Sequence, residues 1–454
     1  AALEQALVEA IARAEPSVVA IARVRRDEPG ERAGSEFRLR PFDENLMPAP
    51  EPQPTDPDFI PSEYGAGVVV DSRGLILTSA KLLADDSDYY VTTRTRQVHR
   101  AKIRAADPRS ELAVLSIEVR DLSPITFGDG GAVRKGQVVI TLGNPYAIAR
   151  DGQASAGWGI VSNLNRKAPP LGAVAEVSAR PTLHHFGTLI QTDAKLNVGA
   201  SGGPLLNLKG EMIGLVVGPV AAAGYDPAGG YAIPVDETFR RAVDTLKQGR
   251  EVEYGFLGVQ PSSLSAAERS EGAHGMHVER VVPGTPAARH GIAPGDRITH
   301  VNSRPIYDAD GLILEVGRMP VDSVAKVRLV RHGRPQTVDV VLSKYPVRGR
   351  KIVSERPPAW RGLRVDYSTA LPEVATGVRD VTAFPEVGVV VTDVEPESSA
   401  WKAGARPGMF LSHVAGRPVH SPREFRAAVA DRTGPVVLRA TDDSVQLEPV
   451  QPEG

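Results

Sequence analysis

The sequence predicts a mainly β protein built from short strands, and its composition, periodicity and length all support this. Gly and Pro, which favour turns, number 44 and 38 among 454 residues. Long segments with helical periodicity are scarce, whereas short apolar runs bounded by turn residues are common. The length corresponds to about three domains of roughly 150 residues. We therefore expect several β-rich domains, each large enough to bury a core.

The composition excludes several classes of function. Hydrophobic residues make up 41% and charged residues 24%, which is ordinary for a globular protein. The net charge of −2 gives no bulk attraction to nucleic acid or to an anionic membrane. The chain has no cysteine, which excludes disulfides and cysteine-based metal sites, and we expect no metal or cofactor. No apolar run reaches the roughly 20 residues of a membrane span, and membrane association stays open.

The N-terminal region begins with a predicted helix. Residues Leu3 to Ala14 place apolar side chains at helical spacing, and Pro16 ends the pattern. Ser17 to Val24 reads as the first strand. Residues 27–62 are rich in Pro, Asp and Glu without periodicity, which predicts a long, mobile surface insertion. The chain starts without methionine, which leaves open the removal of a signal peptide or anchor.

Short strands separated by glycine turns follow, at a spacing typical of a sandwich or barrel. The segments are Gly65–Val70, Leu75–Thr78, Tyr89–Thr93, Leu112–Ile117, Val138–Leu142 and Met212–Val217. Residues 169–181 read as a second loop. A helix predicted over Asp236 to Gln248 closes the first domain, which spans residues 1–250.

Two later segments look alike and predict an internal repeat of a small domain. Gly255-Phe256-Leu257-Gly258-Val259 is followed 36 residues after Gly255 by Gly291. Gly362-Leu363-Arg364-Val365 is followed 42 residues after Gly362 by Gly404. The predicted repeats span residues 251–346 and 359–450, and the basic, proline-bearing stretch 347–358 is the predicted linker.

The turn Gly199-Ala200-Ser201-Gly202-Gly203-Pro204 has the form of a strained nucleophile turn. Glycine permits backbone conformations that direct the amides of Gly199 and Ser201 toward one point. Such converging amides form an oxyanion hole. Ser201 is thus a candidate nucleophile, for which the rest of the chain must supply a base.

Several of these segments together resemble a known protein family. Residues 1–250 resemble the protease domain of the HtrA (Deg) family, which implies a chymotrypsin-like double β-barrel. The repeats resemble PDZ domains, so the implied fold is a double barrel followed by two PDZ domains. The matching segments in the barrel region are Gly65–Val69, Gly74–Thr78, Leu112–Leu115, Gly143–Pro145, Gln191–Ala194, Gly199–Pro204 and Tyr231–Pro234.

The catalytic triad is where the sequence departs from this family. The resemblance places the catalytic histidine at Lys81 and the catalytic aspartate at Glu111. Ser201 keeps the nucleophile position, while Ala200 replaces the usual asparagine. The triad positions are therefore Ser201, Lys81 and Glu111, with substitutions at two of the three.

A serine hydroxyl needs a base to accept its proton. A lysine with the ordinary pKa of about 10.4 is almost entirely protonated at pH 7. A neighbouring carboxylate favours the charged ammonium form further. Lys81 and Glu111 are therefore expected to form an ion pair that fills the space of a His–Asp pair and removes the base. Ser–Lys proteases on other folds keep the alternative open, in which Lys81 is the base.

Three histidines and one aspartate are further candidates for these roles. His99, His184 and His185 match no family position, and we expect each to be a surface loop histidine. Asp107 is an alternative carboxylate to Glu111, but Asp107-Pro108 reads better as a turn. By resemblance, Val198 and the loop 218–230 line a specificity pocket suited to small apolar side chains.

The first repeat carries the expected carboxylate loop, Phe256-Leu257-Gly258-Val259, whose amides would hold a peptide C-terminus. Tyr254 stands where the family often has a basic residue, and Gly295-Asp296 matches a turn after a short helix. In the second repeat Arg364 is expected where the loop glycine would lie, and Met409 replaces the aspartate. That repeat is predicted to be a degenerate domain used for packing or weak binding.

The sequence thus predicts a homologue of HtrA proteases that binds unfolded proteins or peptide C-termini, with proteolysis lost or impaired. The alternatives are an active serine endopeptidase using Ser201 with Lys81, and a purely structural multidomain protein. The resemblance implies the bacterial periplasm or cell envelope, a role in protein quality control as a chaperone, adaptor or regulator, and a homotrimer. No nucleic-acid partner is expected.

Overall fold

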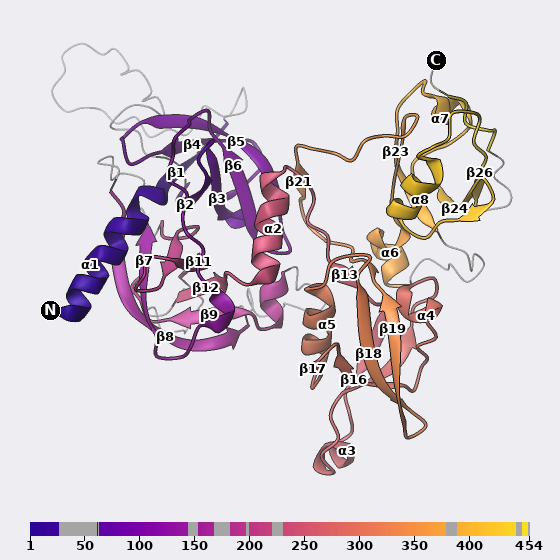
Figure 1. The fold of residues 1–454 in the computed structure, drawn as a ribbon, viewed down its shortest axis with the longest axis horizontal. Helices are drawn as coiled ribbons and strands as arrows, with labels where there is room; N and C mark the ends of the chain where they lie inside the picture. Colours follow the sequence, from indigo (N-terminus) through magenta and orange to yellow (C-terminus); the bar gives the residue numbers. More distant parts are fainter. Residues whose placement is uncertain are drawn as a thin grey trace, which may run out of the picture. The chain divides into compact units, whose positions relative to one another are not determined.

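The computed structural model describes residues 1–26, 61, 63–143, 153–167, 182–196, 199–219, 230–377, 388–441 and 447–452. Apart from Pro61, the predicted insertion at 27–62 lies outside the described residues, as does the predicted loop at 169–181. The chain divides into two compact units (Figure 1). They are Ala1–Val252 with Gly349–Glu355, and Glu253–Arg348 with Arg356–Gly454.

The first unit opens with α1 and a six-stranded barrel. Strands β5 and β6 pair with each other and close the sheet, and the short β21 extends it beyond β5. Buried aliphatic side chains such as Ile21, Ile76 and Leu115 fill this barrel. The elements are α1 (Ala2–Ala14), η1 (Glu15–Ser17), β1 (Val18–Arg25), β2 (Glu63–Asp71), β3 (Leu75–Ser79), η2 (Ala80–Leu82), β4 (Ser87–Thr92), β5 (Val98–Asp107), β6 (Leu112–Ser116) and β21 (Ile352–Val353).

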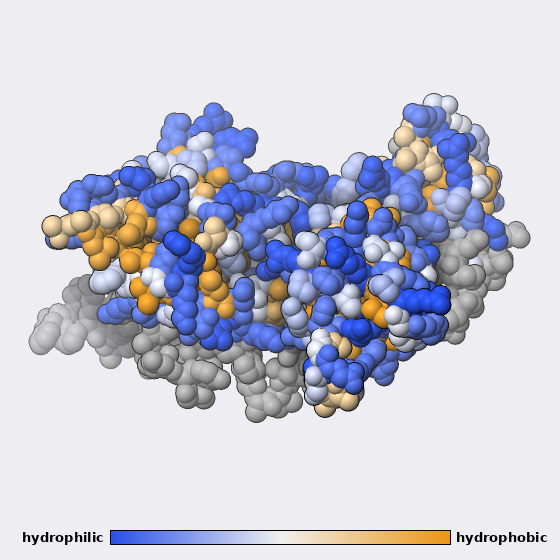
Figure 2. Space-filling view, turned by 60° about the horizontal axis from the view of Figure 1, so that its bottom comes forward, coloured by the Kyte–Doolittle hydropathy of each residue, from blue (hydrophilic) through white to orange (hydrophobic). Residues whose placement is uncertain are grey.

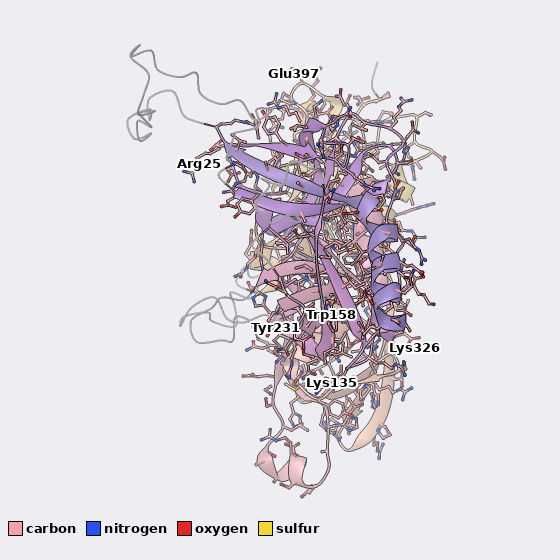
Figure 3. All side chains as sticks on the ribbon, turned by 90° about the vertical axis from the view of Figure 1, so that its left-hand side faces the viewer. Arg25, Lys135, Trp158, Tyr231, Lys326 and Glu397 are labelled. Carbon is pink, nitrogen blue, oxygen red and sulfur yellow. The ribbon has the colours of Figure 1, made fainter. Side chains whose placement is uncertain are left out.

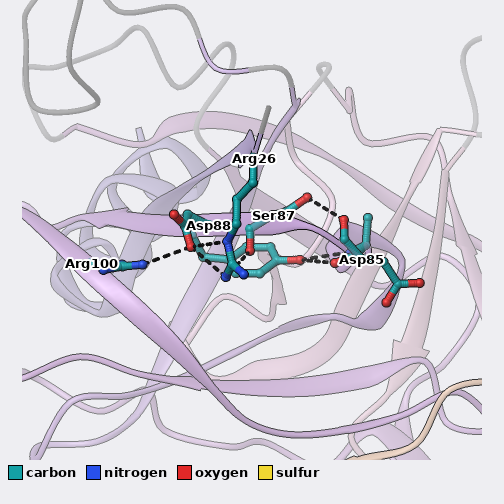
Figure 4. A network of polar contacts seen from close by, with 7 residues as sticks. Arg26, Asp85, Ser87, Asp88 and Arg100 are labelled. Carbon is teal, nitrogen blue, oxygen red and sulfur yellow. Dashed lines mark hydrogen bonds and ion pairs between the residues drawn. The ribbon is translucent and has the colours of Figure 1, made fainter. Parts of the chain in front are cut away.

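A polar network ties β1, β4 and β5 together on the outside of this barrel (Figure 4). Asp88 accepts ion-pair contacts from Arg26 at 2.8 Å and from Arg100 at 3.1 Å. Burial alone would raise the pKa of Asp88, but the hydrogen bonds from Arg26 and Arg100 lower it. Asp88 therefore stays ionised and links Arg26, which follows β1, to Arg100 of β5.

The second barrel is closed by six strands in the order β10-β11-β12-β9-β8-β7. Helix α2 follows it, capped by Asp236, which accepts a hydrogen bond from the Phe239 amide at 2.8 Å. The elements are η3 (Gly130–Ala132), β7 (Val138–Gly143), β8 (Ser155–Arg166), η5 (Leu183–Phe186), β9 (Leu189–Thr192), β10 (Pro204–Leu206), β11 (Met212–Pro219), β12 (Gly230–Pro234) and α2 (Glu237–Lys247). The long strands β5 and β8 were not predicted from the sequence.

The second unit begins with the first repeat, taken here as residues 253–348. Its six-stranded sheet runs β14-β15-β16-β18-β19, with β17 paired to β16, and β13 pairs separately with β20. The elements are β13 (Gly255–Phe256), β14 (Val259–Ser262), α3 (Ala266–Ser270), β15 (Met276–Val281), α4 (Pro286–Arg289), β16 (Arg297–Val301), β17 (Arg304–Pro305), α5 (Ala309–Gly317), β18 (Val324–Arg331), β19 (Arg334–Val341) and β20 (Ser343–Lys344).

The second repeat, residues 356–454, shows much the same order of strands and short helices around a core of its own. Strand β22 lies at the edge of its sheet, as β14 does in the first repeat. The elements are β22 (Leu363–Tyr367), η6 (Ser368–Ala370), α6 (Pro372–Ala375), β23 (Val389–Val394), α7 (Ser399–Lys402), β24 (Phe410–Val414), β25 (Arg417–Pro418), α8 (Pro422–Val429) and β26 (Leu438–Ala440).

The visible surface in Figure 2 is mostly hydrophilic, with smaller hydrophobic areas. Among the exposed apolar residues is Trp158 on β8, which is 57% exposed and labelled in Figure 3. Leu3 and Val8 of α1 are also exposed. In the part of the chain that the structure describes, every helix is too short or too polar to cross a bilayer.

Candidate functional site

The turn that carries Ser201 is anchored on both barrels of the first unit. The Ser201 carbonyl accepts a hydrogen bond from the Ala66 amide of β2 at 2.8 Å. The Gly202 amide donates to the Val216 carbonyl of β11, also at 2.8 Å. Gly202 has a φ of 85°, and a Cβ on it would lie 2.2 Å from the Ala66 carbonyl oxygen. Only glycine fits this position, and the side chain of Ser201 is thereby placed where the barrels meet.

The amides expected to form the oxyanion hole have no hydrogen-bond acceptor among the described residues. Gly199 has a φ of 91°, which glycine adopts readily. Neither the Gly199 amide nor the Ser201 amide donates to any residue that the structure describes. Val198 and most of the loop 218–230, predicted to line a specificity pocket, lie outside the described residues.

Lys81 and Glu111 form the predicted ion pair, with 3.0 Å between Lys81 Nζ and Glu111 Oε2. The lysine side chain is 55% exposed, while the glutamate side chain is 6% exposed. The backbones are joined as well, because the Ala80 amide donates to the Glu111 carbonyl at 2.8 Å. Glu111 has a φ of 57°, a conformation that disfavours most side chains. The pair is thus held by both main chain and side chain.

No hydrogen bond joins Lys81 to Ser201 in the described structure, and Glu111 is the partner of the ammonium group. An ammonium group donates protons and has no lone pair with which to accept one. Lys81 in this state cannot take the hydroxyl proton of Ser201.

His184 corrects a prediction, because it is buried and not a surface loop residue. Only 4% of it is exposed, and it lies in η5. Its Nε2 is 2.9 Å from the Ser110 carbonyl oxygen, and its Nδ1 is 2.7 Å from Thr188 Oγ1. Since a carbonyl oxygen only accepts, Nε2 carries the proton and donates to the Ser110 carbonyl. Nδ1 then accepts a hydrogen bond from the Thr188 hydroxyl. His184 therefore supports the backbone directly before Glu111.

Burial lowers the pKa of His184, and the positive charge of Lys81 lowers it further, although Glu111 and the Ser110 carbonyl oppose them. His184 is therefore neutral at pH 7, but both ring nitrogens are already hydrogen-bonded away from Ser201. Its neighbour His185 contacts Thr182 Oγ1 at 2.8 Å. His99 lies within β5, so it is not a loop residue either. No local sequence signal distinguishes the buried histidine from its neighbour.

Asp107 has a structural role in the turn that precedes Glu111. Its carboxylate accepts hydrogen bonds from the Ser110 amide at 2.8 Å and from Ser110 Oγ at 2.6 Å. This is the turn expected of Asp107-Pro108. Asp107, Ser110 and His184 together fix the chain on the N-terminal side of Glu111. Among the described residues, no group of three or more His, Asp or Glu side chains is arranged to hold a metal ion.

The loop Phe256–Val259 of the first repeat is held from behind. The Leu257 carbonyl accepts from the Ala287 amide at 2.8 Å, and the Gly258 carbonyl accepts from the Val282 amide at 2.9 Å. Gly258 has a φ of 90°, and a Cβ there would lie 2.2 Å from Thr285. The amides of Leu257 and Gly258 donate to no described residue. These amides are available for an anionic group such as a peptide carboxylate.

The second repeat requires a correction of register. The residue equivalent to Gly258 is Gly362, not Arg364. Gly362 has a φ of 81°, and its carbonyl accepts from the Glu395 amide at 2.8 Å, as that of Gly258 does from Val282. Arg364 instead lies on β22 and pairs with Asp393 at 2.7 Å. The signal that aligns the repeats is the aromatic-x-Gly pattern of Phe256-Leu257-Gly258 and Trp360-Arg361-Gly362.

Comparisons with known proteins agree with this architecture. The model of a trypsin-like peptidase domain matches residues 65–215, and that of a PDZ domain matches residues 255–342. The fold is accordingly a mainly β, chymotrypsin-like double barrel followed by a PDZ domain.

Similar curated proteins are named as periplasmic proteases. A "Probable periplasmic serine endoprotease DegP-like" of Chlamydia muridarum is 30% identical over 394 residues, covering 86% of this chain and 73% of that protein. The "Periplasmic serine endoprotease DegP" of Salmonella typhimurium is 28% identical over 390 residues, covering 84% and 75%. Among solved structures, the HtrA-type protease AlgW with a decapeptide superimposes with a TM-score of 0.54 at 25% identity, covering 75% of this chain and 98% of that one.

Proposed function

The chain belongs to the HtrA/DegP family of trypsin-like serine proteases with a PDZ domain, and from that premise we propose that it binds peptides with its proteolysis lost or severely impaired. Its ligands in this proposal are unfolded segments and peptide C-termini. The role is that of a chaperone, adaptor or regulator in protein quality control. The proposed location is the bacterial periplasm or cell envelope, because the curated relatives are named periplasmic.

The Lys81–Glu111 ion pair is the observation that carries the loss of proteolysis. Hydrolysis by Ser201 requires a neutral base within reach of its hydroxyl. At the position of that base stands a cation bound to a nearly buried carboxylate at 3.0 Å. The Lys81–Glu111 pair is net neutral, whereas a neutral histidine with its aspartate carries one negative charge, and an ammonium group has no lone pair with which to accept a proton.

Peptide binding is proposed for two backbone sites. The amides of Gly199 and Ser201 would hold a carbonyl oxygen, and those of Leu257, Gly258 and Val259 would hold a terminal carboxylate beside Phe256. A peptide that pairs with the edge strand β14 would add a strand to the sheet of the first repeat. Neither site needs a titrating side chain.

Assembly into a homotrimer is proposed for the first unit. Exposed apolar side chains on α1 and β8, among them Val8 and Trp158, support an interface between copies. The mass in solution, measured by light scattering during size-exclusion chromatography, should correspond to three chains. A mass of one chain at micromolar concentration would contradict this assembly.

The function is tested by restoring the family's triad. The purified chain is expected to leave a reduced, unfolded protein intact and to resist labelling of Ser201 by a serine-directed electrophile. Lys81→His with Glu111→Asp is expected to restore turnover, because it returns a base and its orienting carboxylate. Addition of Ser201→Ala to that variant is the matched control and should abolish the gain.

Cleavage by the wild-type chain that Ser201→Ala removes would overturn the proposal. The alternative function, an active serine endopeptidase with Lys81 as base, would then hold. Unchanged turnover in a correctly folded Lys81→His, Glu111→Asp variant would show that more than the base has been lost.

A further inference from the structure

The two repeats share one loop framework. Gly258 and Gly362 both have positive φ, and a Cβ on either would lie 2.2 Å from the facing Thr285 or Ser398 side chain. In the second repeat the Ala400 amide donates to the Arg361 carbonyl at 3.1 Å, as Ala287 does to Leu257 in the first. The second repeat therefore has the backbone of a carboxylate loop. It differs from the first repeat in the residues that contact the outer side of that loop.

The first residue of the edge strand after each loop has its N–H and C=O directed away from the sheet, where a peptide ligand could pair with them. Since the carbonyl of Gly362 faces β23, the N–H and C=O of the next residue, Leu363, face away from the sheet. The same alternation turns Val259 of the first repeat outward. A bound peptide would place its last residue opposite these groups.

In the second repeat Trp360 already occupies that place. The Trp360 amide donates to the Leu363 carbonyl at 2.9 Å, and the Leu363 amide donates to the Trp360 carbonyl at 2.8 Å. The two residues form an isolated antiparallel bridge. Both outward groups of Leu363 are thus satisfied by Trp360, the last residue of the segment 357–360 that continues the predicted linker.

The side chain of Trp360 is held as well, because it packs on helix α8. Its ring packs edge-on against Phe425 of α8, with 5.9 Å between ring centroids. Helix α8 corresponds in element order to α5 of the first repeat, and it lies against the edge strand β22. Arg364 adds a further tie, because its Nε donates to the Pro357 carbonyl at 3.1 Å.

Arg361 holds the linker in this position. Both Arg361 and Gly362 have left-handed φ, of 49° and 81°, which is the geometry of a tight two-residue hairpin turn. The nearly buried guanidinium donates to the carbonyls of Val450, Arg432 and Gly434 at 2.6–2.9 Å. It also lies 4.8 Å from the centre of the Trp360 ring. Leu257 is not left-handed in the first repeat, so that loop stays open.

We infer that Trp360 is an intramolecular mimic of the last residue of a peptide ligand and keeps the second repeat closed. The second repeat is then a masked site for a peptide with an apolar C-terminal residue, opened when residues 357–360 leave β22. Only the nature of this ligand rests on the peptide-binding function proposed above.

Hydrogen exchange in the full chain, resolved to single amides by electron-transfer fragmentation, tests the contact itself. The Leu363 amide should exchange at least tenfold more slowly than the Val259 amide. Trp360→Gly should remove most of this difference, whereas Pro358→Gly, which loosens the same exposed linker, should leave it. Exchange of Leu363 as fast as that of Val259 in the wild-type chain would overturn the inference.

A labelled pentapeptide of the linker sequence, Arg-Pro-Pro-Ala-Trp with a free carboxylate, tests the masked site. Gly258→Ala removes peptide binding by the first repeat, and a protein with this substitution alone should not bind the probe. Adding Trp360→Gly should produce binding at least tenfold tighter than that of the C-terminal amide, and adding Pro358→Gly should not. No gain in a folded Trp360→Gly variant would refute the masked site. Failure of any C-terminal peptide to bind the wild-type first repeat would instead refute the proposed function, without changing the exchange result.

Discussion

The turn at Ser201 and the loop at Gly258 solve the same structural problem and differ in what surrounds them. Each uses a left-handed glycine where a Cβ would lie 2.2 Å from a neighbouring atom. Each presents two amides that donate to no described residue. At the sequence position where the family has its base, however, this chain has Lys81 in an ion pair with Glu111.

This difference separates binding from catalysis. Two convergent amides suffice to hold an oxyanion or carboxylate, because that requires only fixed dipoles. Hydrolysis needs a proton acceptor in addition. In the function proposed above, the two substitutions at Lys81 and Glu111 remove the reaction and leave the backbone amides that bind peptides.

The largest expected effect comes from breaking the Ser201 turn itself. Gly202→Ala should lower the free energy of unfolding of the barrels by about 3 kcal/mol, combining the cost of left-handed backbone with overpacking. Gly136→Ala is the matched control, since Gly136 has a φ of 85° but no atom within 4 Å of its Cβ. It should cost about 1 kcal/mol in the same urea titration. Equal losses would show that the contacts with Ala66 and Thr78 do not constrain the turn.

A substitution in the corresponding loop of the first repeat should weaken peptide binding and leave the stability of the barrels unchanged. Gly258→Ala is expected to weaken a decapeptide with a free C-terminal carboxylate at least tenfold, about 1.4 kcal/mol, because Thr285 or the loop must move. Gly333→Ala has similar backbone strain with open space around it and should leave the affinity unchanged. Fluorescence anisotropy measures both, and similar affinities for all three proteins would contradict the carboxylate loop.

The barrels and repeats could be predicted because their motifs are local. Glycine turns and apolar runs mark β2, β3 and β6, and the Leu-Ala-Val-Leu run fixes Glu111 in register opposite Lys81. Strands β5 and β8 were missed because polar and glycine residues interrupt their apolar pattern. Their place in the sheet comes from pairing with neighbours that are already assigned.

The surroundings of the sites could not be predicted in the same way. His184 is buried because η5 packs against the turn 109–111, a contact across 74 residues that its own sequence does not signal. Gly362 was misaligned because Gly-Leu-x-Val resembles the apolar part of the first loop. The left-handed Arg361, which sets the true register, depends on carbonyls far along the chain.

The pH dependence of stability tests whether His184, which supports the turn before Glu111, has a structural role. The pKa of His184 is lowered in the folded chain by burial, so the unfolded chain binds the proton more readily. Its contribution to stability is present above the unfolded pKa of about 6.5 and is lost as the pH falls below it. The loss cannot exceed one proton, about 1.4 kcal/mol per pH unit. In urea titrations between pH 7.5 and 5, His184→Gln should show a shallower decline than the wild type, and an equal slope would contradict this role.

The smallest expected effect on the free energy of unfolding is that of removing Lys81 from its ion pair with Glu111. Lys81→Met removes the partner of a nearly buried carboxylate, but the lysine itself is 55% exposed, so the unfolding free energy should fall by about 1 kcal/mol or less. Lys102→Met is the matched control, because the Lys102–Glu118 pair is exposed on both sides and should contribute nothing measurable. The same Lys81→Met protein should bind the decapeptide with wild-type affinity, since binding in the first repeat needs no titrating group. A loss of peptide affinity in Lys81→Met would break the comparison between the two sites, because it would show that the first repeat depends on a side chain at the substituted triad.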